Sequence, residues 1–284
     1  MEVKKVFVMG AGQMGSGIAQ VFAQAGYEIY MYDISKEILK ESESKIKERL
    51  EKQEQKGKLE KGKSQEIMCR LSSTTDKKAA SECDVLIEAV PEDEDLKKRI
   101  FEEMDEICAE HTILASNTSA IPITKLGSVT KRAEKVIGTH FMNPVPVMKL
   151  VEVIRANLTS DETYQTVVDL LRRLGKEVIT AKDFPGFLST RLIMPFVNEA
   201  LYQLYEGQGT KEDIDKCAKL ALNHPMGPFE WMDFGGLDSI LNVMRNLYEA
   251  YGDKKYLPCP LLVQMVQAGH LGRKTGRGFY NYPE

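Results

Sequence analysis

The sequence of 284 residues lacks several features that would point to particular classes of protein. It contains no run of about 18 apolar residues, so we expect no membrane-spanning helix. Its formal net charge is only −4, with both signs mixed along the chain, which gives no indication of a nucleic-acid or membrane-surface partner. Internal repeats and low-complexity segments are also absent.

Cysteine is scarce, and its distribution argues against two kinds of stabilising site. The five cysteines show no paired spacing, which favours reduced thiols in a cytoplasmic protein over a disulfide framework. No group of Asp, Glu, His and Cys residues has the spacing of metal ligands, so we expect no metal site. The N-terminus leads directly into an apolar run, and we therefore expect no targeting segment.

A glycine-rich motif near the N-terminus organises the first part of the chain. An apolar run leads into Gly10-Ala11-Gly12-Gln13-Met14-Gly15, helical periodicity follows, and a second apolar run ends at Asp33. Such a motif alone also occurs in ordinary glycine-rich loops. The order of strand, motif, helix, strand and acid favours a dinucleotide-binding unit.

Each part of this motif has a physical role in binding a dinucleotide. Gly10 allows a tight turn, Gly12 lets the pyrophosphate approach the backbone, and Gly15 lets the helix pack against the strand. The helix N-terminus offers N–H groups to the phosphates. Asp33 would meet the adenosine ribose hydroxyls. Its negative charge, where a 2′-phosphate would sit, predicts NAD over NADP, although Lys36 lies close in sequence.

Short apolar runs alternate with helical patterns over the first 183 residues. The alternation predicts an α/β fold with a Rossmann-type, doubly wound and mostly parallel sheet. Strands are expected at 85–90, 113–116, 136–139, 151–154 and 178–181. Ligands bind outside the carboxyl ends of such strands. A common crevice should therefore be lined by the residues that follow strand ends, which are Gly10, Asp33, Pro91, Asn117 and His140.

The composition changes at the turn after Asp183, and we place a domain boundary there, between residues 1–183 and 184–284. Beyond it only helical patterns recur. The first of them, from Leu188 to Leu204, has a broad apolar face that is typical of a core or a subunit interface. Further helices are predicted at 211–222, 236–251 and 260–269.

Residues 36–66 form the most highly charged stretch of the chain. Sparse apolar positions predict helices with a narrow buried stripe, and Gly57 and Gly62 divide them into a helical arm. One interpretation is a solvated helix pair held by surface ion pairs. The other is an arm whose lysines bind a phosphorylated substrate. Further along, Thr159 to Glu162 matches a capping box at the start of another helix.

Four histidines are candidates for proton transfer. His111 and His270 fit helix ends or surface positions, and His224 fits a structural turn. His140 differs because it follows a predicted strand on the cofactor side. Glu152 lies on the next strand, and a short loop would return it beside His140, where a carboxylate orients an imidazole. A buried ion pair and two independent surface residues stay open as alternatives.

Six motifs follow one another along essentially the whole chain. The motifs are Gly10-Ala11-Gly12-Gln13-Met14-Gly15, Ser116-Asn117-Thr118-Ser119, His140-Phe141-Met142-Asn143-Pro144, Pro185-Gly186-Phe187, Pro225-Met226-Gly227-Pro228-Phe229 and the run from Gly272 to Tyr280. Together they closely resemble the L-3-hydroxyacyl-CoA dehydrogenase family.

The resemblance implies an NAD-dependent, reversible oxidation of a (S)-3-hydroxyacyl-CoA to the 3-ketoacyl-CoA. His140 would be the general base, with Glu152 as its orienting partner. Ser119 would hydrogen-bond the substrate oxygen. Thr190 falls where the family usually has an active-site asparagine. It would either keep a polar role in catalysis or only satisfy a backbone N–H at a helix start.

The resemblance also implies binding residues and an assembly. Asn143 would lie near the nicotinamide, and Lys56 on the arm would meet the CoA. Arg49 falls where some relatives have a serine that contacts CoA. We expect an acyl-CoA as the partner molecule and a homodimer joined through the helical domains. Further positions that match cofactor-binding ones are Gln13, Met14, Glu92, Lys97, Asn117, Ser119 and Lys274.

Two other functions stay open. A sister enzyme for 3-hydroxyisobutyrate or a sugar acid would share the nucleotide fold, but such enzymes typically use a lysine base and need no charged arm. A crystallin-like structural relative would bind NAD(H) without turnover, and we would expect it to have lost the pair of His140 and Glu152.

Overall fold

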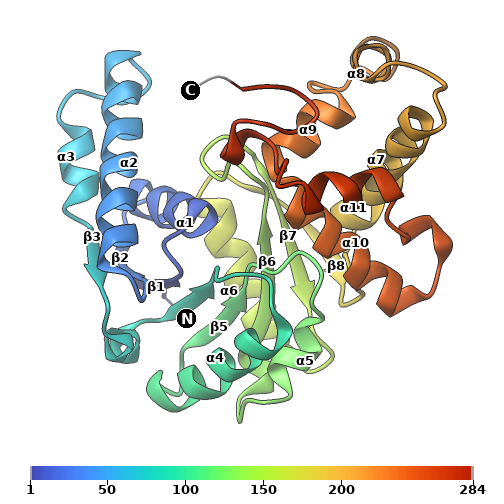
Figure 1. Cartoon of the computed structure of the whole chain (residues 1–284). Coiled ribbons are helices and arrows are strands. Elements are labelled where there is room, and N and C mark those ends of the chain that lie inside the picture. Colours follow the sequence, from blue (N-terminus) through green and yellow to red (C-terminus); the bar gives the residue numbers. More distant parts are fainter. Residues whose placement is uncertain (1, 283–284) are drawn as a thin grey trace. The chain divides into compact units, whose positions relative to one another are not determined.

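The structure is a computed structural model that describes residues 2–282, and it divides into two compact units, residues 1–184 and 185–284 (Figure 1). The first unit holds a β-sheet with helices on its faces, and the second is built from helices. Within the described residues, no helix is long and apolar enough to cross a lipid bilayer.

A single eight-stranded sheet forms the centre of the first unit. Its strands are β1 (Lys5–Met9), β2 (Glu28–Tyr32), β3 (Leu71–Thr74), β4 (Val85–Glu88), β5 (Ile113–Ser116), β6 (Val136–Phe141), β7 (Leu150–Arg155) and β8 (Glu177–Lys182). They lie in the order β3-β2-β1-β4-β5-β6-β7-β8, and all neighbours are parallel except β6 and β7. The predicted doubly wound, mostly parallel sheet is confirmed.

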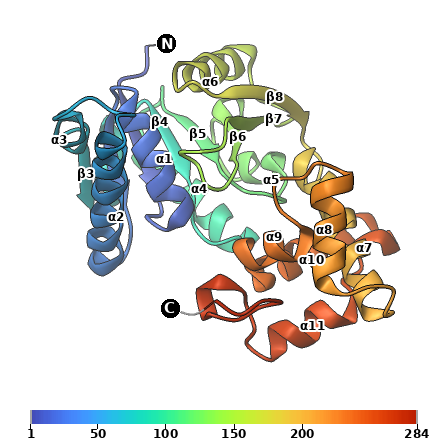
Figure 2. The same cartoon turned by 90° about the horizontal axis from the view of Figure 1, so that it is seen from above.

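Helices cover both faces of this sheet. They are α1 (Gln13–Gln24), α4 (Glu94–Ile107), α5 (Ile123–Gly127) and α6 (Asp161–Arg173). On one face, Val8 of β1 shares an apolar core with Phe22 of α1 and Val167 of α6. On the other face, α5 packs so close to β6 that a Cβ on Gly138 would lie 2.9 Å from Ile123 Cγ1. Figure 2 shows α6 and α5 on opposite sides of β6.

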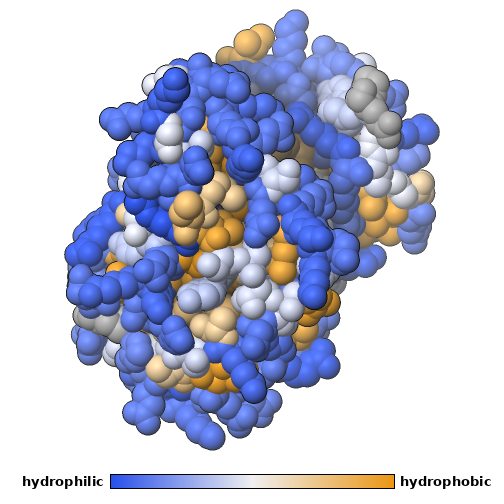
Figure 3. All heavy atoms as spheres, turned by 90° about the vertical axis from the view of Figure 1, so that its left-hand side faces the viewer, coloured by the Kyte–Doolittle hydropathy of each residue, from blue (hydrophilic) through white to orange (hydrophobic). Residues whose placement is uncertain are grey.

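The charged stretch forms a helical arm, α2 (Lys36–Gln55) and α3 (Lys63–Met68). Ser35 caps α2 by accepting a hydrogen bond from Ile38 N. The arm buries a narrow stripe of apolar side chains that includes Ile46 and Leu50. The side of the molecule that carries α2 and α3 is largely hydrophilic, as Figure 3 shows.

Five α-helices lie in the described part of the second unit, and four of them were predicted from helical patterns. They are α7 (Ser189–Tyr205), α8 (Lys211–Ala221), α9 (Pro228–Gly235), α10 (Leu237–Tyr251) and α11 (Pro260–Gln267). Their apolar faces share a core in which Leu201, Phe229 and Met244 are buried. The segment after α11 forms a short 3-10 helix, Arg273–Thr275, and isolated β-bridges between Gly272 and Arg277 and between Arg277 and Asn281.

Two local predictions were wrong. β6 continues to Phe141, so His140 lies inside the strand and not after it, because its pairing with β7 extends to that residue. Thr159 does not cap α6. Its hydroxyl donates instead to Val136 O over 2.6 Å, and Ser160 takes the cap position and accepts from Thr163 N.

Among the described strands and α-helices, β3, α5 and α9 were not predicted. β3 is a short edge strand with the sequence Leu71-Ser72-Ser73-Thr74, which carries little apolar alternation. α5 and α9 are only five and eight residues long, too short to show a clear helical period.

Candidate active site

The glycine-rich loop has the packing that the motif predicts. Gly10 has a φ of +99°, and a Cβ there would lie 2.6 Å from Ala89 O. A Cβ on Gly15 would lie 1.7 Å from Gly10 O, so α1 can pack this closely only with glycine. A Cβ on Gly12 would meet no atom within 4 Å. The space beside Gly12 suits a ligand that approaches the backbone.

Two polar side chains fix this loop from outside. Asp33, which follows β2, accepts from Ala11 N over 2.9 Å with Oδ2 and from Ser35 N over 3.1 Å with Oδ1. Ser42 of the arm helix α2 donates to Ala11 O over 2.5 Å. Both the N–H and the C=O of Ala11 are therefore hydrogen-bonded, and the arm is joined directly to the glycine-rich loop.

Gln13 and Met14 begin helix α1 next to this loop. Gln13 Nε2 donates to Asn143 Oδ1 over 3.1 Å, so two predicted cofactor-binding residues from distant segments contact each other. Met14 is partly buried against the apolar core of the first unit.

His140 and Glu152 face each other across the antiparallel pair β6 and β7, where they are register partners. His140 Nδ1 lies 2.7 Å from Glu152 Oε2. Glu152 is fully buried, and only 7% of His140 is exposed. The prediction that Glu152 returns beside His140 is confirmed, and the alternative of two independent surface residues is wrong.

A tight turn after β5 carries Asn117 and Ser119. Glu92 accepts from the backbone N–H of Ser119 over 2.9 Å and of Ala120 over 3.1 Å. Asn117 Oδ1 accepts from Phe141 N over 2.9 Å. The turn is thus tied to β6 directly beside His140.

The buried side chain of Lys97 lies close to the acids that contact this turn. Only 1% of its side chain is exposed, and its Nζ lies 2.6 Å from Glu88 Oε1 and 3.4 Å from Glu92 Oε2. Glu88 is fully buried at the end of β4 and was not predicted as a site residue. The available signal was an ionisable residue inside an otherwise apolar strand.

The arm carries Arg49 and Lys56 two helical turns apart. Arg49 Nε donates to Lys45 O over 3.2 Å, its Nη2 is buried without a hydrogen-bond partner within residues 2–282, and burial lowers the pKa of the guanidinium. Lys56 is exposed at the C-cap of α2. Earlier on the same helix, Lys45 and Lys52 each pair with a glutamate one turn away.

The two remaining predicted site residues, Thr190 and Lys274, lie in the second unit. Thr190 lies in the first turn of α7 and is 6% exposed. Leu188, and not Thr190, occupies the N-cap position of α7. Lys274 Nζ lies 2.6 Å from both carboxylate oxygens of Asp238. Although burial opposes it, the hydrogen bond from Lys274 lowers the pKa of Asp238.

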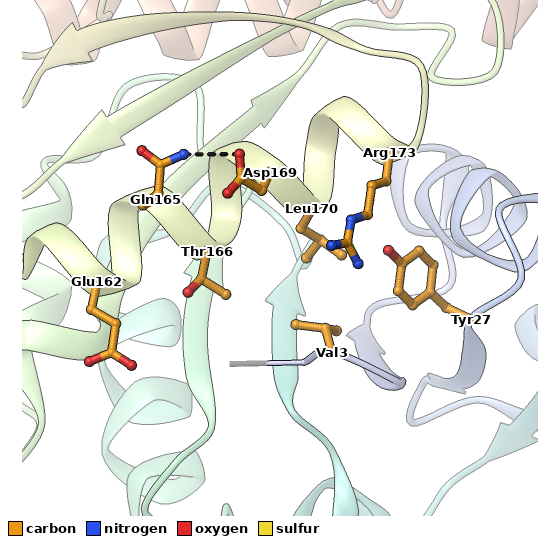
Figure 4. Close-up of a pocket in the computed structure, with 8 residues that line it drawn as sticks. All are labelled: Val3, Tyr27, Glu162, Gln165, Thr166, Asp169, Leu170 and Arg173. Carbon is orange, nitrogen blue, oxygen red and sulfur yellow. Dashed lines mark hydrogen bonds between the residues drawn. The ribbon is translucent and has the colours of Figure 1, made fainter.

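A depression of about 360 Å³ lies elsewhere on the first unit, beside α6 (Figure 4). Val3 and Tyr27 line it, and they precede β1 and β2, so it sits at the amino ends of these strands. In such folds ligands bind at the carboxyl ends. Gln165 and Asp169 on its wall bond to each other. Among residues 2–282, no group of three or more His, Cys, Asp or Glu side chains is placed to hold a metal ion.

Comparison with known proteins identifies the family to which both units belong. The 3-hydroxyacyl-CoA dehydrogenase NAD binding domain matches residues 5–184, and the 3-hydroxyacyl-CoA dehydrogenase C-terminal domain matches residues 186–282. The chain belongs to the 3-hydroxyacyl-CoA dehydrogenase family. It is therefore an NAD-dependent oxidoreductase, and Asp33 lies in its NAD-binding domain.

Individual members of the family are similar over their full length. A probable 3-hydroxybutyryl-CoA dehydrogenase of Bacillus subtilis is 49% identical, over 100% of this chain and 99% of the relative. The 3-hydroxybutyryl-CoA dehydrogenase of Clostridioides difficile is 45% identical, over 98% and 99%. The crystal structure of (S)-3-hydroxybutyryl-CoA dehydrogenase from Ralstonia eutropha matches with a TM-score of 0.93 at 44% identity, covering 100% of both chains.

Proposed function

We propose that this enzyme interconverts (S)-3-hydroxybutyryl-CoA and acetoacetyl-CoA, with His140 as the acid and base and Glu152 as its orienting partner. The observation that carries the proposal is the buried contact of 2.7 Å between His140 Nδ1 and Glu152 Oε2, on the strand next to the turn that carries Ser119. The full-length similarity to 3-hydroxybutyryl-CoA dehydrogenases supports the choice of substrate.

The residues of the first unit fit NAD. The open space beside Gly12 suits a pyrophosphate, and the start of α1 offers N–H groups to it. Asp33 places a negative charge beside the loop, and the following Ile34 is 85% exposed and offers no cation. When bound, NAD supplies the acceptor of the hydride. We expect a higher kcat/KM with NADH than with NADPH, and the opposite preference would contradict this role of Asp33.

Acid–base chemistry follows from the orientation of His140. Because Glu152 holds Nδ1, the imidazole directs Nε2 to take the proton of the substrate hydroxyl during oxidation. The carboxylate then stabilises the imidazolium. Ser119 would donate to the substrate oxygen and keep it in line with His140. In the reverse direction the imidazolium returns the proton.

The arm supports recognition of the CoA part of the substrate. Lys56 is exposed and makes no ion pair within residues 2–282, and Arg49 retains an unpartnered Nη2 two turns away on the same helix. Cations in this arrangement attract phosphates. We therefore propose that both residues bind the CoA nucleotide.

The decisive assay follows NADH oxidation with acetoacetyl-CoA and, separately, with free acetoacetate. We expect turnover with the thioester and little with the free acid. Preference for a free hydroxy acid or keto acid would favour the sister enzymes. Binding of NADH without turnover of either substrate would favour a structural protein.

The second unit supports a homodimer. Leu192 of α7 and Leu220 of α8 are each 76% exposed, and a groove of about 360 Å³ between these helices is lined by Phe196 and Leu222. A second copy would cover these apolar side chains. Leu192→Asp should yield a monomer in light scattering. Leu158→Asp, at a leucine that is 67% exposed in the first unit, should not.

The five free thiols support a reducing, cytoplasmic compartment as the place where the enzyme works. Fractionation of the source cells tests this. Activity confined to an oxidising compartment would contradict it.

A further inference from the structure

Two acids contact the turn that carries Ser119, the fully buried Glu88 and the partly exposed Glu92. Glu88 accepts from Ser116 Oγ over 2.6 Å, and Ser116 Oγ in turn accepts from Thr118 N over 3.2 Å. The carbonyl of Glu88 also accepts from Asn117 N over 2.8 Å. Glu92 holds the next two backbone N–H groups, those of Ser119 and Ala120. The backbone on either side of Ser119 is thus fixed by carboxylates.

Lys97 links these two acids. Its Nζ lies between Glu88 Oε1 and Glu92 Oε2 and also donates to Val90 O over 3.2 Å. With an exposure of 1%, it cannot offer its charge to a molecule outside unless this network opens. Breaking one side of such a buried pair leaves the other charge uncompensated, whereas replacing both sides together is tolerated far better.

The turn is also joined to the strand that carries the proton-transfer residue. Asn117 lies between the two carboxylate contacts, and its Oδ1 binds Phe141 N, the residue after His140. Glu88, Ser116 and His140 also project from the same face of the sheet, because side chains alternate along strands and these strands are neighbours in register. A shift of the turn would therefore move Ser119 relative to His140.

We propose that Glu88 is a positioning residue for the reaction, and that Lys97 acts through it. Their buried contact holds the turn 116–120 so that the Ser119 hydroxyl keeps its place relative to His140. The inference rests on the proposed function, in which Ser119 binds the substrate oxygen. Glu88 itself touches neither substrate nor cofactor. Misplacement of a reacting group by about 1 Å is enough to lower a rate about 10²-fold.

The test is a double-mutant cycle between Glu88→Gln and Ser119→Ala, measured as kcat with acetoacetyl-CoA and NADH. Glu88→Gln alone should lower kcat by about 10–10²-fold, with a smaller change in KM for NADH. In the Ser119→Ala background it should have almost no further effect, because the group it positions is already absent. Effects that multiply would contradict positioning and leave a structural role only.

A matched control separates positioning from stability. Asp105 is a buried acid on the same unit, and it pairs with Arg132 Nε over 2.6 Å, away from the turn. Asp105→Asn should lower the melting temperature without lowering kcat. The double variant Glu88→Gln with Lys97→Met removes both charges and should recover melting temperature relative to Glu88→Gln. Its kcat should stay low, and full recovery of kcat would overturn the proposal.

A milder variant covers the case that Glu88→Gln does not fold. Ser116→Ala removes the hydroxyl between Glu88 and Thr118 N and leaves no charge unpaired. It should lower kcat about 3- to 10-fold and have no effect in the Ser119→Ala background. An unchanged kcat in Ser116→Ala would contradict the proposal. If the wild-type enzyme itself does not reduce acetoacetyl-CoA, the proposed function has failed. If the wild-type enzyme is active and the variants have the same kcat as the wild type, this inference alone has failed.

Discussion

The buried acidic side chains of the two units have different kinds of partner. In the first unit, Glu88, Asp105 and Glu152 lie 2.6 to 2.7 Å from Lys97, Arg132 and His140, respectively. In the second unit, Asp215 and Asp233 are 2% and 1% exposed. Their carboxylates accept from backbone N–H groups and tyrosine hydroxyls instead. These donors belong to Phe229, Glu230, Phe279, Tyr280 and Tyr282.

This difference has an electrostatic consequence. Burial raises the pKa of Asp215, and the hydrogen bonds from Phe229 N and Tyr280 offset this only in part. The same contact and burial raise the pKa of Tyr280. An acid paired with a cation keeps its charge more easily than one held by neutral donors. The first arrangement suits groups that act as ions during a reaction, and the second suits clamps that join segments of backbone.

The largest effect should come from breaking the pair at the site. Glu152→Gln keeps the shape but removes the charge that supports the imidazolium, and His140→Ala removes the proton acceptor. Both should lower kcat by roughly the 10²–10⁴-fold that positioned proton transfer contributes. NADH affinity should barely change. Stopped-flow kinetics and NADH titration check both, and a fully active Glu152→Gln enzyme would refute the catalytic pair.

A second variant asks whether the helical unit contributes to chemistry at all. Thr190 is buried early in α7. Thr190→Val removes its hydroxyl at nearly constant shape and would leave a substrate acceptor unpaired, at a cost of about 1–3 kcal/mol. We therefore expect kcat/KM to fall about 5- to 150-fold with little change in melting temperature. Unchanged kinetics would mean that the Thr190 hydroxyl takes no part in the reaction.

Exposed charge should affect binding and not the chemical step. Lys56→Ala should raise KM for acetoacetyl-CoA several-fold and leave kcat unchanged, with a larger effect at low salt, where screening is weak. A pantetheine thioester, which lacks the nucleotide phosphates, serves as the control substrate and should not respond. Equal losses on both substrates would mean that the arm is only structural.

The sequence allowed the fold and the pair at the site to be predicted for one physical reason. Apolar strands and their ends can be recognised from local sequence patterns. Because ligands bind at the carboxyl ends of parallel strands, these patterns also indicate where the binding site lies. His140 and Glu152 then followed from a short connection between neighbouring strands. The outcome for His140 shows the limit, since the end of β6 depends on its partner β7 and not on local residues.

What could not be predicted depends on contacts between distant segments. Ser42 binds Ala11 O from another helix, and Glu88 binds Lys97 and Ser116 within a buried network. Nothing local distinguishes such a serine from a surface residue of a charged helix. Lys97 was predicted as a cofactor contact, but a sequence motif does not show whether its ammonium group is exposed or buried, and in the structure it is buried.

The smallest effect on activity should come from Asp215, and it tests the other half of the comparison. Asp215→Asn keeps the shape but weakens the contacts to α9 and Tyr280, so it should cost about 1–3 kcal/mol of stability while leaving kcat unchanged.

Because burial raises the pKa of Asp215 in the folded state, the folded protein holds this proton more tightly than the unfolded chain. Wild-type stability therefore decreases as pH rises from its ordinary value of 3.8 through the raised folded value. The variant lacks this group, so the gap in unfolding free energy between the two proteins should be widest at low pH and narrow as pH rises. Urea titrations at several acidic pH values measure the gap. A gap that widens with pH would mean that Asp215 is stabilised as an ion, which would contradict its account as an acid held by neutral donors.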